Sequence, residues 1–158
     1  MMVFLPLPPA QARRLRSGED LGRRRAHAVT PTLLRALGPD SSEEECDYAA
    51  LSAAGTAALD GLTDLAQGRR LVVAAEVGPG QVDDLRDDLG AVAVERVTWA
   101  QVQALFADEQ DAAGLVRAAA AAATGVPLDR ALDLPPVVAL AESFDLLWYA
   151  PAELDVLG

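Results

Sequence analysis

Short apolar runs separated by glycine and proline recur along the chain, and runs of about four to eight residues predict β-strands. The first run, residues 2–7, contains proline and suits a strand near the edge of a sheet. A second strand is expected at 26–30. The nearly continuous apolar run at 69–77 is typical of a central strand covered on both faces, and the alternation at 91–97 predicts another strand.

Helices are expected where capping residues and alanine-rich segments occur. Pro9 begins a short helix over 9–17, and Thr30 before Pro31 gives an N-cap followed by proline at the first helical position. Residues 110–124 are helical by their alanine content, with Thr124–Gly125 as the stop.

The clearest helix is expected over residues 42–67. Ser41 with Glu44 and Ser42 with Glu45 both fit a capping box, and Gly68 follows the last turn. Residues at alternating spacings of three and four share one face of this helix, and they are Tyr48, Leu51, Gly55, Ala58, Leu62 and Leu65. Small residues in the middle of that face predict close packing against a sheet or another helix.

The C-terminal segment after Pro135–Pro136 predicts a β-hairpin with arms at 137–141 and 144–149. Adjacent strand residues point to opposite faces, so we expect Trp148 and Tyr149 to fill separate layers of the core. Pro151 then begins a last helical turn. Residues 81–90 and 102–108 do not distinguish helix, strand and loop, although 102–108 favours a strand.

These elements predict an α/β fold, with α+β as the alternative. We expect a single globular domain over residues 1–158, built on one mixed β-sheet of five to seven strands. The long helix packs across the sheet, and the hairpin closes the chain. A chain of 158 residues can bury a core without metals or disulfides.

The charge distribution limits the partners that we expect. The formal net charge is −11, which argues against broad binding to nucleic acids or anionic membranes. Residues 1–25 nevertheless hold six arginines and two acidic residues. We interpret them as a solvated arginine face near the acidic surface of the same molecule, with phosphate binding as the alternative. A single cysteine, the order of the N-terminal residues and the lack of a long apolar run favour a cytoplasmic protein.

Few side chains offer catalytic chemistry. The only histidine, His27, lies in a valine- and alanine-rich strand, where a packed, hydrogen-bonded role is more common than catalysis. The catalytic candidates are His27, Glu44, Glu45 and Tyr48, with Asp47 as a further carboxylate. Cys46 follows three glutamates, whose charge opposes thiolate formation. We expect no cofactor and no metal, because zinc would need ligands that the chain does not supply in a usual set.

An acidic segment lies between the third and fourth expected strands. Asp83, Asp84, Asp87 and Asp88 would share a face if this segment were helical, and they could then hold a hard divalent cation weakly. A solvated acidic loop is the preferred interpretation. The chain has no nucleophile elbow, P-loop or dinucleotide-binding turn.

Four segments carry a resemblance to a known family. They are AHAVTPTLL, EEECDYAALSAAGTAAL, RRLVVAAEV and FDLLWYAPAEL. Together they resemble an uncharacterised family of small actinobacterial proteins, classed as a domain of unknown function, which ends in an LLWYAPQE-like segment. Here Ala152 stands where glutamine is usual, and Phe106 stands where a histidine is frequent. The resemblance implies a single cytoplasmic domain and brings no catalytic residues.

Two functional hypotheses follow. The first is a non-catalytic cytoplasmic binding or regulatory protein whose partner is another protein or a small ligand. The alternative is a small hydrolase or transferase that uses His27 with nearby carboxylates. The ligand and the oligomeric state do not follow from the sequence.

Overall fold

The sheet is the centre of the molecule. The computed structural model describes residues 1–60, 62 and 68–157, and its seven strands have the order β4-β5-β2-β1-β3-β6-β7. The strands are β1 (Met2–Pro6), β2 (Arg24–Ala28), β3 (Leu71–Glu76), β4 (Val82–Asp84), β5 (Ala91–Val94), β6 (Val102–Ala107) and β7 (Leu147–Tyr149). Every neighbouring pair of these strands is antiparallel. The architecture is therefore α+β, and the expectation of a mixed sheet was wrong.

The first strand lies in the middle of the sheet, not near its edge. β1 pairs with β2 on one side and with β3 on the other, with Phe4 opposite His27 and Leu5 opposite Val73. The proline that suggested an edge is Pro6, the last residue of β1. A proline at the end of a strand removes little from the hydrogen-bond ladder, so the strand can still be central.

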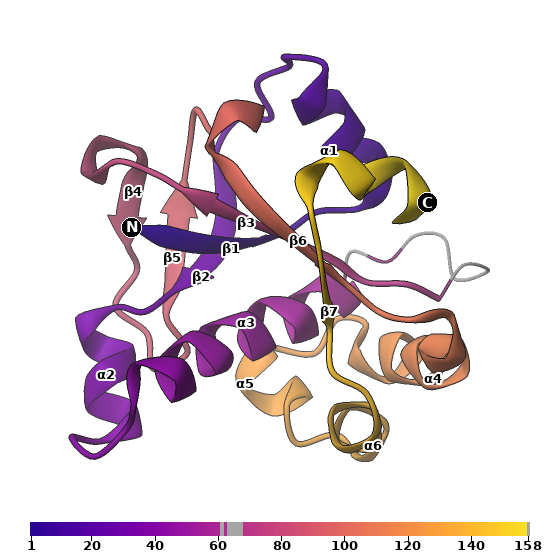
Figure 1. Ribbon diagram of the computed structural model, residues 1–158. Coiled ribbons are helices and arrows are strands. Elements are labelled where there is room, and N and C mark those ends of the chain that lie inside the picture. Colours follow the sequence, from indigo (N-terminus) through magenta and orange to yellow (C-terminus); the bar gives the residue numbers. More distant parts are fainter. Residues whose placement is uncertain (61, 63–67, 158) are drawn as a thin grey trace.

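The two faces of the sheet bury different sets of side chains. Val3 and Leu5 of β1 belong to a core under α1 (Pro9–Arg16) and the C-terminal 3-10 helix η4 (Pro151–Leu157). Phe4 points the other way and packs with Val72 and with residues of the longest described helix, α3 (Glu43–Asp60). Figure 1 shows α1 and the C-terminal segment on one side of the sheet and the remaining helices on the other.

The second face is covered by several helices together. Besides α3, these are α2 (Pro31–Leu37), α4 (Ala113–Ala123), α5 (Leu128–Ala131) and α6 (Pro135–Ser143) (Figure 1). The end of α3 shares a separate apolar cluster with α4, α5 and α6, and the cluster includes Leu59, Val116 and Leu140. No helix of the described residues is long and apolar enough to cross a membrane.

The capping box predicted for Ser42 and Glu45 is present at the start of α3. Ser42 Oγ accepts a hydrogen bond from Glu45 N at 3.1 Å, and the Glu45 carboxylate accepts one from Ser42 N at 3.3 Å. Its predicted end falls among residues 61 and 63–67, which lie outside the described residues. The predicted buried face was partly wrong, since Tyr48 is 56% exposed. The side that packs on the sheet is made of small residues such as Ala50 and Ala54, which allow a close approach.

The prediction of a C-terminal β-hairpin was also wrong. Residues Pro135–Ser143 form α6, in which proline occupies the first turn. Its valines suggested a strand, but proline at a helix start and the following Ala-Leu-Ala-Glu segment favour a helix. Only Leu147–Tyr149 is a strand, β7, and it pairs with β6 so that Trp148 lies opposite Phe106.

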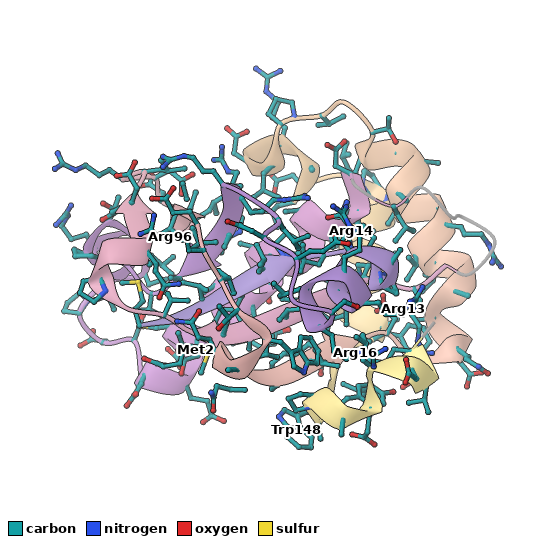
Figure 2. All side chains as sticks on the ribbon, turned by 90° about the horizontal axis from the view of Figure 1, so that it is seen from above. Met2, Arg13, Arg14, Arg16, Arg96 and Trp148 are labelled. Carbon is teal, nitrogen blue, oxygen red and sulfur yellow. The ribbon has the colours of Figure 1, made fainter. Side chains whose placement is uncertain are left out.

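The two adjacent aromatics therefore have different environments. Tyr149 packs against the core under α1 and η4, whereas Trp148 is 61% exposed. Figure 2 shows Trp148 at the periphery of the molecule beside the C-terminal segment. The expectation that Trp148 fills a core layer was wrong: on the edge strand β7 its side chain points to the face opposite Tyr149, and it is left exposed there.

The strands predicted elsewhere in the chain agree better with the structure. Residues 102–107 form β6, as favoured, and the acidic segment forms the short strand β4 followed by a turn. The strands expected at 26–30 and 91–97 are present as β2 and β5 with shifted ends.

The N-cap of α2 gives a first testable prediction. Thr30 is fully buried, and its Oγ1 accepts a hydrogen bond from Leu33 N at 3.2 Å. We expect Thr30→Ala to lower the free energy of unfolding by about 1 kcal/mol, because an N-H at the helix start loses its acceptor. Urea denaturation measures this difference. Thr32→Ala in the same helix is the control, with an expected loss of about 0.5 kcal/mol or less, and equal losses would contradict the capping role.

Candidate functional site

A cavity of about 720 Å³ lies between the sheet and the helices that cover its second face. Pro6, Arg25 and His27 form its wall on the sheet, and Thr56, Ala57 and Asp60 contribute from the last turns of α3. The remaining wall comes from the turn before β5, the end of α4, the segment that follows it and α5. Its residues are Asp87, Asp88, Leu89, Ala123, Val126, Pro127, Leu128, Asp129 and Ala131. This volume lies within the usual range of small-molecule sites, about 300–1,000 Å³.

Strand β2 places two functional side chains on the cavity. Arg25 and His27 are two residues apart in the strand, so their side chains share the face that α3 covers. His27 lies opposite Phe4 in β1 and opposite Ala91 in β5, which puts it deep in the sheet. Arg25 is nearer the rim, with 62% of its side chain exposed.

His27 is fully buried, yet neither ring nitrogen has a hydrogen-bond partner among the described residues. Both nitrogens are also shielded from water. A neutral imidazole carries one donor and one acceptor, and leaving a buried polar group without a partner costs about 1–3 kcal/mol. The sequence predicted a packed, hydrogen-bonded histidine. The structure confirms the packing, but it gives the ring no hydrogen bond.

Burial sets the charge of this histidine. Removal from water lowers the pKa of His27 from 6.5 to about 4, opposed by the negative charge of Asp87 and assisted by the positive charge of Arg25. The ring is therefore neutral at pH 7. One nitrogen is free to accept a hydrogen bond, and the other carries a hydrogen that it can donate.

Asp87 fixes the turn that closes one side of the cavity. Its Oδ1 accepts hydrogen bonds from Leu89 N at 3.0 Å and from Ala91 N at 2.9 Å, and its Oδ2 accepts one from Arg25 Nη2 at 3.2 Å. Gly90 completes the turn at φ +79°, and a side chain there would collide with the carbonyl oxygen of Ala28. The turn therefore holds Asp87 and Asp88 at the rim.

The rim of the cavity is acidic. Among the described lining residues, Arg25 is opposed by four aspartates, namely Asp60, Asp87, Asp88 and Asp129. Asp60 accepts a hydrogen bond from Gly125 N at 3.2 Å, and Asp129 accepts one from Arg130 N at 3.0 Å. The walls between these carboxylates are largely apolar. The cavity therefore favours a ligand that combines positive charge with hydrocarbon.

A bound metal ion does not fit this arrangement well. Within residues 1–60, 62 and 68–157, no group of three or more histidine, cysteine or carboxylate side chains is placed to hold one ion. Asp83, Asp84, Asp87 and Asp88 do not share a helical face, because Val82–Asp84 is a strand and a turn follows it.

The candidates from the sequence separate in space. His27 lies on the cavity wall, whereas Glu44, Glu45 and Tyr48 belong to the first turns of α3 and are not among its lining residues. Glu45 caps α3, Glu44 is exposed, and Tyr48 Oη donates a hydrogen bond to Asp145 at 3.2 Å. Asp47 is exposed as well, and partial burial, with the nearby charge of Glu43, raises its pKa.

Sequence reasoning weighed Asp87 and Asp88 as ligands of a divalent cation but missed other residues of the cavity. Arg25 was assigned to the N-terminal arginine face, and Asp60 and Asp129 were given no functional role. One signal was available, because the two-residue spacing in RRAHA places Arg25 beside His27 on the same strand face. The approach of Asp87 depends on the pairing of β2 with β5 and could not be inferred from spacing alone.

The N-terminal arginines lie against carboxylates of the same molecule, as the sequence predicts. The pairs are Arg14 with Glu19 at 2.6 Å, Arg16 with Asp155 at 2.9 Å and Arg23 with Asp83 at 2.8 Å. The pairing lowers the pKa of Asp155 through its hydrogen bond with Arg16. Figure 2 shows Arg13, Arg14 and Arg16 around α1, on the face opposite α3, and Arg96 apart from them. The only cysteine, Cys46, is free and buried.

The fold and the cavity define an α+β protein with an antiparallel seven-stranded sheet and a ligand-sized, acidic pocket over a neutral histidine. The chain belongs to the family described as Family of unknown function (DUF6912), whose sequence model matches residues 1–157. The resemblance to a domain of unknown function is thereby confirmed. No curated protein and no solved structure matches the chain.

Proposed function

We propose that the protein is a non-catalytic binding protein and that it holds a small molecule in the cavity over His27. The supporting observation is a fully buried imidazole, on the wall of a cavity of ligand size, whose nitrogens lack partners among the described residues. A ligand that hydrogen-bonds to this ring would offset the free energy that its unpartnered nitrogens cost. Binding at the ring requires the side chains that shield it to move apart.

Several features favour binding over catalysis. A histidine with a pKa of about 4 is a weak base at neutral pH, and its nitrogens are shielded from water. Among the described residues that line the cavity there is no serine and no cysteine, and the one hydroxyl group is that of Thr56 on α3. We place this binding protein in the cytoplasm as part of the proposal, because its one cysteine is a free thiol.

Fragment binding tests the proposal. We expect amines, carboxylates, alcohols and heterocycles, screened by NMR, to include compounds that shift the signals of Ala57, Ala123 and Leu128. Ala57→Phe places a bulky ring in the cavity and should strongly reduce these shifts, whereas Ala121→Phe, on the exposed side of α4, should leave them unchanged. Circular dichroism confirms that both variants are folded. If no fragment perturbs the cavity residues, the proposal fails.

The alternative, a hydrolase or transferase that uses His27 with a nearby carboxylate, rests on one observation. The charge of Asp87 acts on the ring and raises its basicity, although burial outweighs this effect. Assays with ester, phosphate and nucleotide substrates distinguish the two functions. We expect no turnover. Turnover that His27→Ala abolishes would establish the enzyme instead.

A further inference from the structure

We propose that the ligand of this cavity is an aliphatic diamine or polyamine, whose ammonium groups pair with the rim aspartates while its alkyl chain lies along the apolar walls. This inference rests on the proposed function and specifies its ligand class. Three properties of the site support it, namely the distribution of charge, the separation of the carboxylates and the composition of the walls.

Three of the four rim aspartates form no ion pair with the described residues. Asp87 forms an ion pair with Arg25. The ion pairs of the described residues include none to Asp60, Asp88 or Asp129. Asp60 and Asp129 accept hydrogen bonds only from backbone N–H groups of the described residues. A cationic ligand would therefore meet three carboxylates that form no ion pair with a described side chain.

The placement of the carboxylates favours a ligand with more than one charged group. Asp60 ends α3, Asp88 lies in the turn before β5, and Asp129 is on α5, so they approach the cavity from three elements. These carboxylates are not grouped tightly enough, among the described residues, to hold a single metal ion. Carboxylates on separate elements suit a chain whose ammonium groups are separated by methylenes.

The walls and the floor fit the rest of such a ligand. Ala57, Val126, Pro127 and Leu128 line the cavity with apolar surface that methylene groups can cover. Once the side chains that shield the ring move apart, the neutral imidazole of His27 can offer an acceptor nitrogen to an ammonium donor. A dicarboxylate would instead meet repulsion from the rim, and a diol would leave the rim charges unpaired.

Calorimetric titration at low salt tests the ligand class, with putrescine and spermidine as probes. We expect both amines to bind, and 1,4-butanediol and succinate to bind at least tenfold more weakly. A ligand whose amines pair with the rim should also lose affinity as salt screens the charges. Equal binding of the diol, or tighter binding of succinate, would overturn the assignment.

Paired variants separate the cavity from the general acidity of the protein. Asp88→Asn with Asp129→Asn should weaken spermidine binding about five- to tenfold, because two partly exposed ion pairs are lost. Asp111→Asn with Asp133→Asn removes the same charge outside the cavity lining and should change affinity less than twofold. Equal weakening in both double variants would show nonspecific attraction and would contradict the proposed site.

The outcomes also separate this inference from the proposed function. If fragments shift the cavity signals but neither amine binds, the cavity is a binding site and the diamine assignment is wrong. If neither fragments nor amines perturb Ala57, Ala123 and Leu128, both proposals fail. Saturable amine binding that shifts the NMR signals of these residues supports both proposals.

Discussion

Replacing Asp108 with alanine is expected to lower the free energy of unfolding by about 3–5 kcal/mol, the largest effect of any substitution considered. Asp108 is fully buried, and its carboxylate accepts hydrogen bonds from Arg70 Nε and Nη2, both at 2.8 Å, and from Arg70 N at 2.9 Å. Arg70 is itself only 7% exposed. Without Asp108, a buried guanidinium loses its counter-charge and two of its acceptors. Urea denaturation measures the loss.

Two further variants test the reason for this effect. If the cost comes from the uncompensated charge, Arg70→Met combined with Asp108→Leu should recover most of the lost stability, because neither charge is then buried. Glu19→Ala breaks the exposed pair with Arg14 and should cost about 1 kcal/mol or less. A loss for Asp108→Ala no greater than for Glu19→Ala would contradict the importance of the buried pair.

The buried pair has a structural consequence beyond its own atoms. Arg70 immediately precedes β3, and Asp108 immediately follows β6, so the pair joins the ends of two adjacent strands. The main-chain oxygen of Asp108 also accepts a hydrogen bond from Arg69 Nε at 2.6 Å. These contacts set where the strands stop, and the chain turns there toward α4.

Local features of the fold could be predicted from the sequence because their physics is local. The caps at Thr30 and Ser42 depend on residues three positions apart, and both are present. The helix stop at Thr124 is also present. The hairpin failed because Val137 and Val138 favour a strand in isolation, whereas packing of α6 against α4 decides the segment in the folded chain.

Features that join distant residues could not be predicted. Arg70 and Asp108 are 38 residues apart, and nothing in either local segment indicates the pairing. The cavity requires β2, the turn before β5, the end of α3 and the start of α5 to meet. Of the catalytic candidates, only His27 lines the cavity, and the sequence drew attention to it because a lone histidine in an apolar strand is conspicuous. The approach of Asp87 and Asp88 to His27 follows from the pairing of β2 with β5, which the sequence did not reveal.

The burial of His27 makes stability depend on pH. Its pKa is about 4 in the folded protein and 6.5 when unfolded, so between these values the unfolded state binds more protons. Stability is therefore fully present above pH 6.5 and falls as the pH is lowered toward 4. The expected loss by pH 4 is about 3 kcal/mol, from a pKa difference of roughly 2.5 units.

The substitution His27→Leu isolates this contribution. Leucine is apolar and of similar size, so the variant should lack the part of the pH dependence that arises between pH 6.5 and 4, while carboxylates such as Asp47 titrate equally in both proteins. Urea denaturation from pH 7.5 to 4.0 gives the difference between the two curves. At pH 7 the variant should be at least as stable as the parent, because it removes buried polar atoms that have no partner. Parallel curves would mean that the ring is already solvated in the folded state, and the cavity would then reach His27 without any movement of the side chains around it.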